Sequence, residues 1–121
     1  MSEKSSLADA LSFNAAEEVA RISARIRELL RSKINRRGLV IGISGGVDSA
    51  VSAALCVKAI GANKVFGLLM PEQDSAAGTT PLGEVVAKHL GINYEIKNIS
   101  TTLEAIGCYH WRDAAIKKIF P

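Results

Sequence analysis

The spacing of apolar residues predicts an amphipathic helix near the start of the chain. Asn14 is a favourable N-cap residue, and Glu17 three residues later completes the sequence pattern of a capping box. Apolar residues then recur at the three- and four-residue spacing of one helical face. These apolar positions are Val19, Ile22, Ile26, Leu29 and Leu30. The segment 35–38, which ends in glycine, is predicted to terminate this helix.

After residue 38 the pattern changes to short apolar runs that alternate with helical segments. The runs predict strands at 39–43, 64–70 and 92–96, and the segments between them predict helices at about 49–60 and 81–90. A helix that joins two parallel strands of one sheet makes a right-handed crossover. The sequence therefore predicts an α/β fold with a parallel sheet.

The two ends of the chain are less regular. Residues 1–12 mix serines with charged residues and predict a flexible N-terminus, which leaves 13–121 as part of a single α/β domain. Residues 99–105 predict a short helix or turn. A break is expected at 107–110, followed by a final helix at 111–120.

The composition is typical of one modest globular domain, with 121 residues, 48% of them hydrophobic and 22% charged. No apolar run approaches the length of a membrane helix. Cys56 and Cys108 match no zinc spacing, and with no signal peptide in front we expect free thiols and a cytoplasmic location. A net charge of +3 is compatible with anionic ligands, but it is too small to predict a nucleic-acid partner.

A glycine-rich turn joins the first predicted strand to the next helix. Such a turn, placed at a helix N-terminus, forms an anion site because the first helical N–H groups have no intrahelical partner and the helix dipole favours negative charge. Gly45 and Gly46 permit positive φ and a close approach of phosphate to the backbone. The alternative is an ordinary glycine turn between a strand and a helix.

Asp48 sets this turn apart from a Walker A loop, which requires a lysine followed by serine or threonine. A carboxylate and a phosphate in one pocket repel each other unless a cation lies between them. The sequence therefore predicts Mg²⁺ at this turn, with Asp48 as an oxygen ligand.

A second polar loop, residues 71–80, follows the second predicted strand. It leaves the carboxyl end of that strand, next to the glycine-rich turn. Ligands of open α/β sheets bind at the carboxyl ends of the strands. We expect this loop to contact adenine and ribose, partly through backbone groups near Leu69 and Met70, and Ser75 is a candidate contact. An equal alternative is that Ser75 and Asp74 only shape the turn.

The segment Ser44–Ser49 meets every position of the Ser-Gly-Gly-x-Asp-Ser signature and so resembles the N-type ATP pyrophosphatases. Together with the Leu-Met-Pro sequence at 69–71 and Ser75, it is similar to the ammonia-dependent NAD synthetases. The resemblance covers most of 14–121. It implies a three-layer α/β/α fold with a Rossmann-like parallel sheet, of the adenine nucleotide alpha hydrolase-like type.

The resemblance also implies a two-step reaction. The carboxylate of deamido-NAD attacks the α-phosphorus of ATP to give an adenylate and pyrophosphate, and ammonia then displaces AMP to form the amide of NAD. Asp48 would hold Mg²⁺, the hydroxyls of Ser44 and Ser49 would donate to phosphate oxygens, and no protein nucleophile is required. The implied ATP contacts are Gly42, Ile43, Ser44, Gly45, Gly46, Val47, Asp48, Ser49, Leu69, Met70 and Ser75.

Members of this family are considerably longer than 121 residues, so we expect an N-terminal fragment. Such a fragment would bind nucleotide weakly at best and would make no NAD. Because truncation exposes apolar surface and the family is homodimeric, we expect a homodimer.

Two other interpretations are open. The loop also fits other ATP pyrophosphatases, including tRNA-modifying enzymes and GMP synthetase, and a non-catalytic adenine-nucleotide-binding module of the same fold. The arginines of the first helix are expected to form a solvated face, with a polyanion site as the alternative. Few aromatic residues are present to stack bases, so a nucleic-acid partner is not expected.

Overall fold

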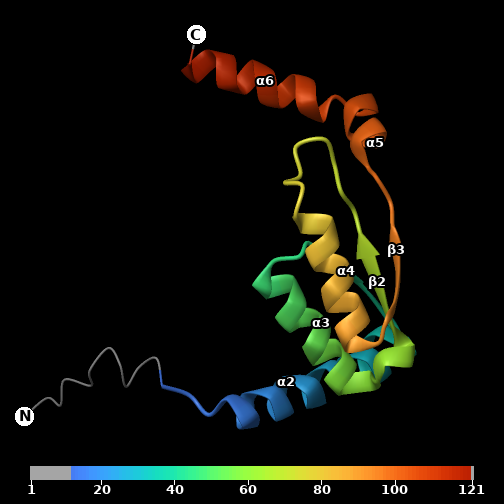
Figure 1. Cartoon of the computed structure of the whole chain (residues 1–121). Helices are drawn as coiled ribbons and strands as arrows, with labels where there is room; N and C mark the ends of the chain where they lie inside the picture. The colour runs from blue at the N-terminus through green and yellow to red at the C-terminus, as the bar shows by residue number, and fades with distance from the viewer. Residues whose placement is uncertain (1–11, 121) are drawn as a thin grey trace, which may run out of the picture.

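The computed structural model describes residues 12–120, and the flexible segment predicted at 1–12 lies almost entirely outside that range (Figure 1). The helices and strands follow the predicted order. They are α2 (Ala15–Leu29), η1 (Leu30–Ile34), β1 (Leu39–Gly42), α3 (Val47–Ile60), η2 (Ala62–Lys64), β2 (Val65–Leu69), α4 (Thr79–Leu90), β3 (Asn93–Ile96), α5 (Ser100–Ala105) and α6 (Cys108–Ile119).

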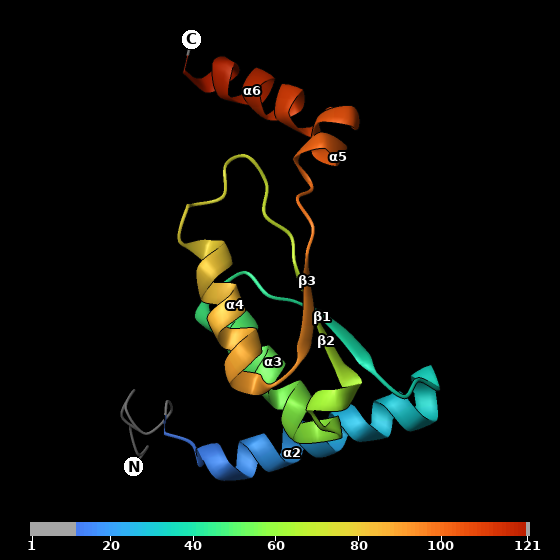
Figure 2. The same cartoon turned by 45° about the vertical axis from the view of Figure 1, so that its right-hand side comes forward.

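The three strands form one parallel sheet in the order β1-β2-β3, which confirms the predicted Rossmann-like arrangement. In the register, Leu39 lies opposite Val65, and Phe66 lies opposite Asn93. Both crossover helices, α3 and α4, cover the same face, because the chain moves across the sheet in one direction with one crossover hand (Figures 1 and 2). No helix within residues 12–120 covers the opposite face, so the described part of the chain supplies two of the three expected layers.

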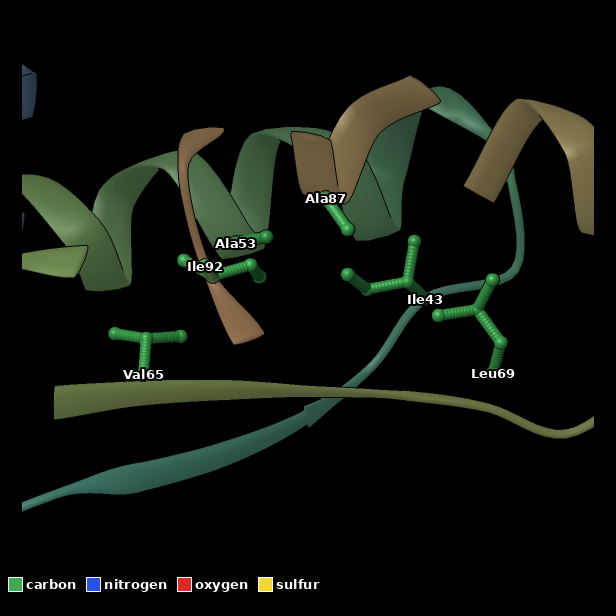
Figure 3. Packing of buried hydrophobic residues seen from close by; sticks show 6 residues of the cluster. All are labelled: Ile43, Ala53, Val65, Leu69, Ala87 and Ile92. Atoms are coloured by element: carbon green, nitrogen blue, oxygen red, sulfur yellow. The ribbon is translucent and has the colours of Figure 1, made fainter. Parts of the chain in front are cut away.

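The core lies between the sheet and the two crossover helices (Figure 3). Ala53 of α3 and Ala87 of α4 are fully buried, and their small side chains let both helices approach the strands closely. Strands and strand ends supply the larger side chains. The core cluster is Ile43, Ala53, Val65, Leu69, Ala87 and Ile92.

Helix boundaries differ from the prediction at three places, one of which is α4, which begins at Thr79 rather than at about 81. The helix α3 begins at Val47 rather than near Ser49, because Gly46 takes the N-cap position with an extended backbone. The break predicted at 107–110 is confirmed only at Gly107, whose φ is +83°: Ile106 and Gly107 turn the chain, and α6 begins at Cys108 rather than at 111. By contrast, the predicted cap of α2 is confirmed, since Asn14 Oδ1 accepts from the Ala16 and Glu17 N–H groups at 3.1 and 3.4 Å.

The remaining helices lie at opposite ends of the sheet (Figures 1 and 2). The helix α2 packs against α3, where Arg27 Nη1 donates to the Ala59 carbonyl at 3.2 Å. At the carboxyl end of the strands, α5 and α6 extend beyond the loop that follows β2. Among the described residues, no helix is both long and apolar enough to cross a membrane.

Candidate functional site

The glycine-rich turn 43–46 connects β1 to α3 and packs against the start of α4. Gly45 has φ of +81°, a conformation that side chains disfavour. A Cβ atom at Gly45 would lie 2.5 Å from the Thr79 carbonyl oxygen and 3.0 Å from Leu82 Cβ. Glycine is therefore required at this position for two independent reasons, the backbone conformation and the contact with α4.

The first turn of α3 presents backbone N–H groups at this loop. The first intrahelical bond is donated by Ala50 to the Gly46 carbonyl at 3.1 Å. The N–H groups of Val47, Asp48 and Ser49 precede it and have no intrahelical acceptor. The positive end of the helix dipole lies at the same place, so the turn has the properties of an anion site.

The hydroxyl groups of Ser44 and Ser49 hold the turn in shape. Ser49 Oγ donates to the Gly46 carbonyl at 2.9 Å and accepts from the Ser44 N–H at 3.2 Å. Because a serine hydroxyl has one proton, the 3.1 Å contact between the two hydroxyls is donated by Ser44. Ser44 Oγ in turn accepts from the Gly46 N–H at 3.3 Å. The direct role predicted for these hydroxyls, donation to phosphate oxygens, would require both protons to be redirected.

Asp48 is the second residue of α3, and it is exposed at the mouth of the turn. Within residues 12–120 it makes no hydrogen bond or ion pair through its carboxylate. No group of three or more His, Cys, Asp or Glu residues in that range is arranged to hold a metal ion. Asp48 can thus supply one ligand, and other oxygens must complete the coordination of a cation.

A hollow of about 150 Å³ lies between the turn and the loop after β2. Its lining residues come from two distant segments of the chain, and several of them were predicted from the sequence to lie in one site. Its lining is Ile43, Ser44, Leu69, Met70, Pro71, Ser75, Thr79 and Thr80. Gly42 lies beside this hollow, since a Cβ there would be 3.7 Å from Met70 Cε. Thr79 and Thr80 were not named individually as contacts, although both fall in the 71–80 loop that the sequence placed near the nucleotide; the helix α4 in fact begins at Thr79.

Ser75 has the turn-shaping role, one of the two alternatives considered for it, and its role as a ligand contact stays a prediction. Its Oγ accepts from the Glu72 N–H at 3.0 Å, and its own N–H donates to the Glu72 carbonyl at 3.0 Å, so it shapes the turn. It also lines the hollow. By contrast, Val47 is 73% exposed and lies outside the lining, so only its backbone N–H is placed for a ligand.

A second and larger hollow, of about 520 Å³, lies at the opposite end of the sheet. It has a partly apolar floor of Leu30, Ala59 and Ile60. Its basic lining residues are Arg27, Arg31, Arg36, Arg37 and Lys64. The arginines of the first helical segment are all exposed, as expected of a solvated face, and Arg27 and Arg31 also border this hollow. The basic lining makes the hollow a competing location for an anion.

Comparison with known proteins identifies the family. The sequence profile described as NAD synthase matches residues 18–119 of the chain. The chain belongs to the NAD synthase family. An NH(3)-dependent NAD(+) synthetase from Rhizobium rhizogenes is 49% identical over 113 residues, which cover 93% of this chain and 34% of the relative. The chain thus spans about a third of the length of such relatives.

Solved structures agree with this assignment. The NH3-dependent NAD synthetase from Campylobacter jejuni, in complex with the nitrate ion, matches with a TM-score of 0.71 and 31% identity. That match covers 78% of this chain and 40% of the other. The NMN synthetase from Francisella tularensis matches with a TM-score of 0.68 and 26% identity over 84% of this chain and 41% of the other.

Proposed function

We propose that this chain supplies the ATP-binding loops of an ammonia-dependent NAD synthetase, an AMP-forming carbon–nitrogen ligase. The observation that carries the proposal is the juxtaposition of the glycine turn with the loop after β2. Free N–H groups at the start of α3, which suit an anion, lie beside a hollow lined by Leu69, Met70 and Ser75. The family assignment supports the choice of ATP as the nucleotide.

In the proposed reaction, a carboxylate oxygen of deamido-NAD forms a bond to the α-phosphorus of ATP, and the bond to pyrophosphate breaks. The nitrogen of ammonia then attacks the acyl carbon, AMP leaves and a proton is released. A carboxylate has no good leaving group of its own, and adenylation provides one. The contribution of this chain is positioning and charge neutralisation through the N–H groups of Val47, Asp48 and Ser49.

The described residues supply only part of the coordination that the predicted Mg²⁺ would need. Asp48 offers one free carboxylate beside the anion site, and Mg²⁺ commonly takes one or two carboxylates with phosphate oxygens and water. When bound, the ion would neutralise charge on the phosphate chain. Asp48 would hold it at the mouth of the turn.

We also propose a homodimer located in the cytoplasm. The sheet face opposite α3 and α4 carries Val40, which is 70% exposed, and Phe66, which is 37% exposed. Apolar side chains gathered on an uncovered sheet face favour association with another protein surface.

The proposal predicts nucleotide binding without turnover in the 121-residue chain. The midpoint temperature of thermal unfolding should rise when ATP and Mg²⁺ are added together. It should rise by less with ATP alone, because the ion links the phosphates to Asp48. Incubation with deamido-NAD, ATP and ammonia should yield no AMP above the protein-free control. Equal stabilisation by ATP with and without Mg²⁺ would favour the non-catalytic binding module. Formation of AMP and NAD would contradict the claim that this chain is incomplete as an enzyme.

A further inference from the structure

The loop between β2 and α4 carries part of the candidate nucleotide site, yet it has little support of its own. Residues 73–78 are exposed and form no helix or strand. Local bonds around Glu72 and Ser75 close a tight turn, and Thr79 Oγ1 donates to the Ala76 carbonyl at 2.7 Å. Anything that holds this turn from outside therefore affects where Ser75 lies relative to the hollow.

The segment after β3 supports the start of this loop through backbone hydrogen bonds. The Lys97 N–H donates to the Leu69 carbonyl at 2.8 Å, and the Ile99 N–H donates to the Pro71 carbonyl at 3.0 Å. These bonds continue the parallel pairing beyond the ends of β2 and β3. They bring the start of α5 next to Pro71.

Glu72 connects the turn to α6. Its Oε1 accepts from the Asp74 N–H at 3.0 Å, and its Oε2 accepts from the Tyr109 hydroxyl at 2.8 Å. One carboxylate thus joins the interior of the turn to a residue 37 positions later in the chain. Partial burial raises the pKa of the Tyr109 phenol, and the hydrogen bond to Glu72 raises it further, so this hydroxyl remains a donor at neutral pH.

Arg112, one turn further along α6, makes the second contact with the loop. Its Nη1 pairs with Asp74 Oδ2, and its guanidinium lies 5.2 Å from the centre of the Tyr109 ring. Asp113 accepts from Arg112 Nε at 2.9 Å and orients the guanidinium. Otherwise α6 contributes no buried residue to the described structure. These polar contacts therefore account for the position of α6 against the loop.

We propose that α5 and α6 form a latch that holds the 71–78 loop in the shape that receives nucleotide, with Tyr109 and Arg112 as positioning residues. The inference rests on the proposed function, since it assigns a role to the same site. Both contacts are on the surface and are individually weak. The latch therefore opens readily, and the closed fraction sets the apparent affinity for nucleotide.

Hydrogen exchange of the nucleotide-free 121-residue chain tests the latch directly. Tyr109→Phe and Arg112→Gln should each raise the exchange rates of the Asp74 and Ser75 amides about threefold or more, with an unchanged unfolding midpoint. Arg112→Lys keeps the cation and should retain most of the protection. Lys117→Gln, on the same helix, is the matched control and should change neither rate. Unchanged loop exchange in Tyr109→Phe and Arg112→Gln would overturn the latch.

A titration of the same proteins with Mg·ATP separates this proposal from the one on which it rests. The two latch variants should bind Mg·ATP about threefold or more weakly than the parent chain and the Lys117→Gln control. Equal affinities despite faster loop exchange would overturn the role of the latch at the nucleotide site while leaving the proposed function intact. No binding by the parent chain would contradict the proposed function, and with it the nucleotide-receiving role of the latch.

Discussion

Replacing Gly45 with alanine is expected to destabilise the chain and to abolish nucleotide binding. A side chain forced to keep φ near +81° costs about 1–3 kcal/mol of unfolding free energy. The new Cβ would also lie 2.5 Å from the Thr79 carbonyl oxygen, so either the turn or the start of α4 must move. Chemical unfolding gives the loss of stability, and a titration with Mg·ATP gives the loss of binding.

Gly78→Ala is the matched control, because Gly78 has φ of −85° and a methyl group added there would meet no atom within 4 Å. It also precedes α4 and should change stability by less than about 0.5 kcal/mol, as surface substitutions usually do. Equal stability of the two variants would contradict the packing of the glycine turn against α4.

Replacing Asp48 with asparagine is expected to remove the magnesium dependence of ATP binding. The substitution keeps the size of an exposed side chain that has no partner within residues 12–120, so the fold should be unaffected. Without the carboxylate, a cation on the phosphates loses its protein ligand, and affinity for Mg·ATP should fall at least about tenfold, or about 1.4 kcal/mol. Affinity for ATP without Mg²⁺ should rise, because a like charge has been removed from the anion site.

Glu104→Gln provides the charge-matched control, since it removes one exposed carboxylate from α5. It should leave the ratio of affinities with and without Mg²⁺ unchanged. An Asp48→Asn protein that keeps the magnesium dependence of the parent chain would show that the cation is held elsewhere.

The sheet and the glycine turn could be predicted because their signals are local. A β-branched run, a glycine pair and a helical pattern follow each other directly over 39–60, and each restricts the backbone by itself. The parallel order then follows from the crossover rule, and it brings the end of β1 beside the loop after β2. This is why Ser44 and Ser75 could be placed in one site from sequence alone.

Other features depend on contacts between distant residues and left no local signal. The bond between Tyr109 and Glu72 joins positions 37 residues apart, and the sequence assigned no role to either residue. The internal bonds of the Ser44 and Ser49 hydroxyls depend on the detailed geometry of the turn. The extent of α6 was misjudged because two residues, Ile106 and Gly107, suffice to turn the chain.

The most direct test of the proposed site is where Mg·ATP binds, measured by amide chemical shifts of the isotopically labelled chain during a titration. We expect shift changes to concentrate at residues 44–49 and 69–75, and those at Asp48 and Ser49 to shrink when Mg²⁺ is removed. Shift changes confined to the basic hollow around Arg31 and Arg36, with residues 44–49 unaffected, would contradict the proposed site.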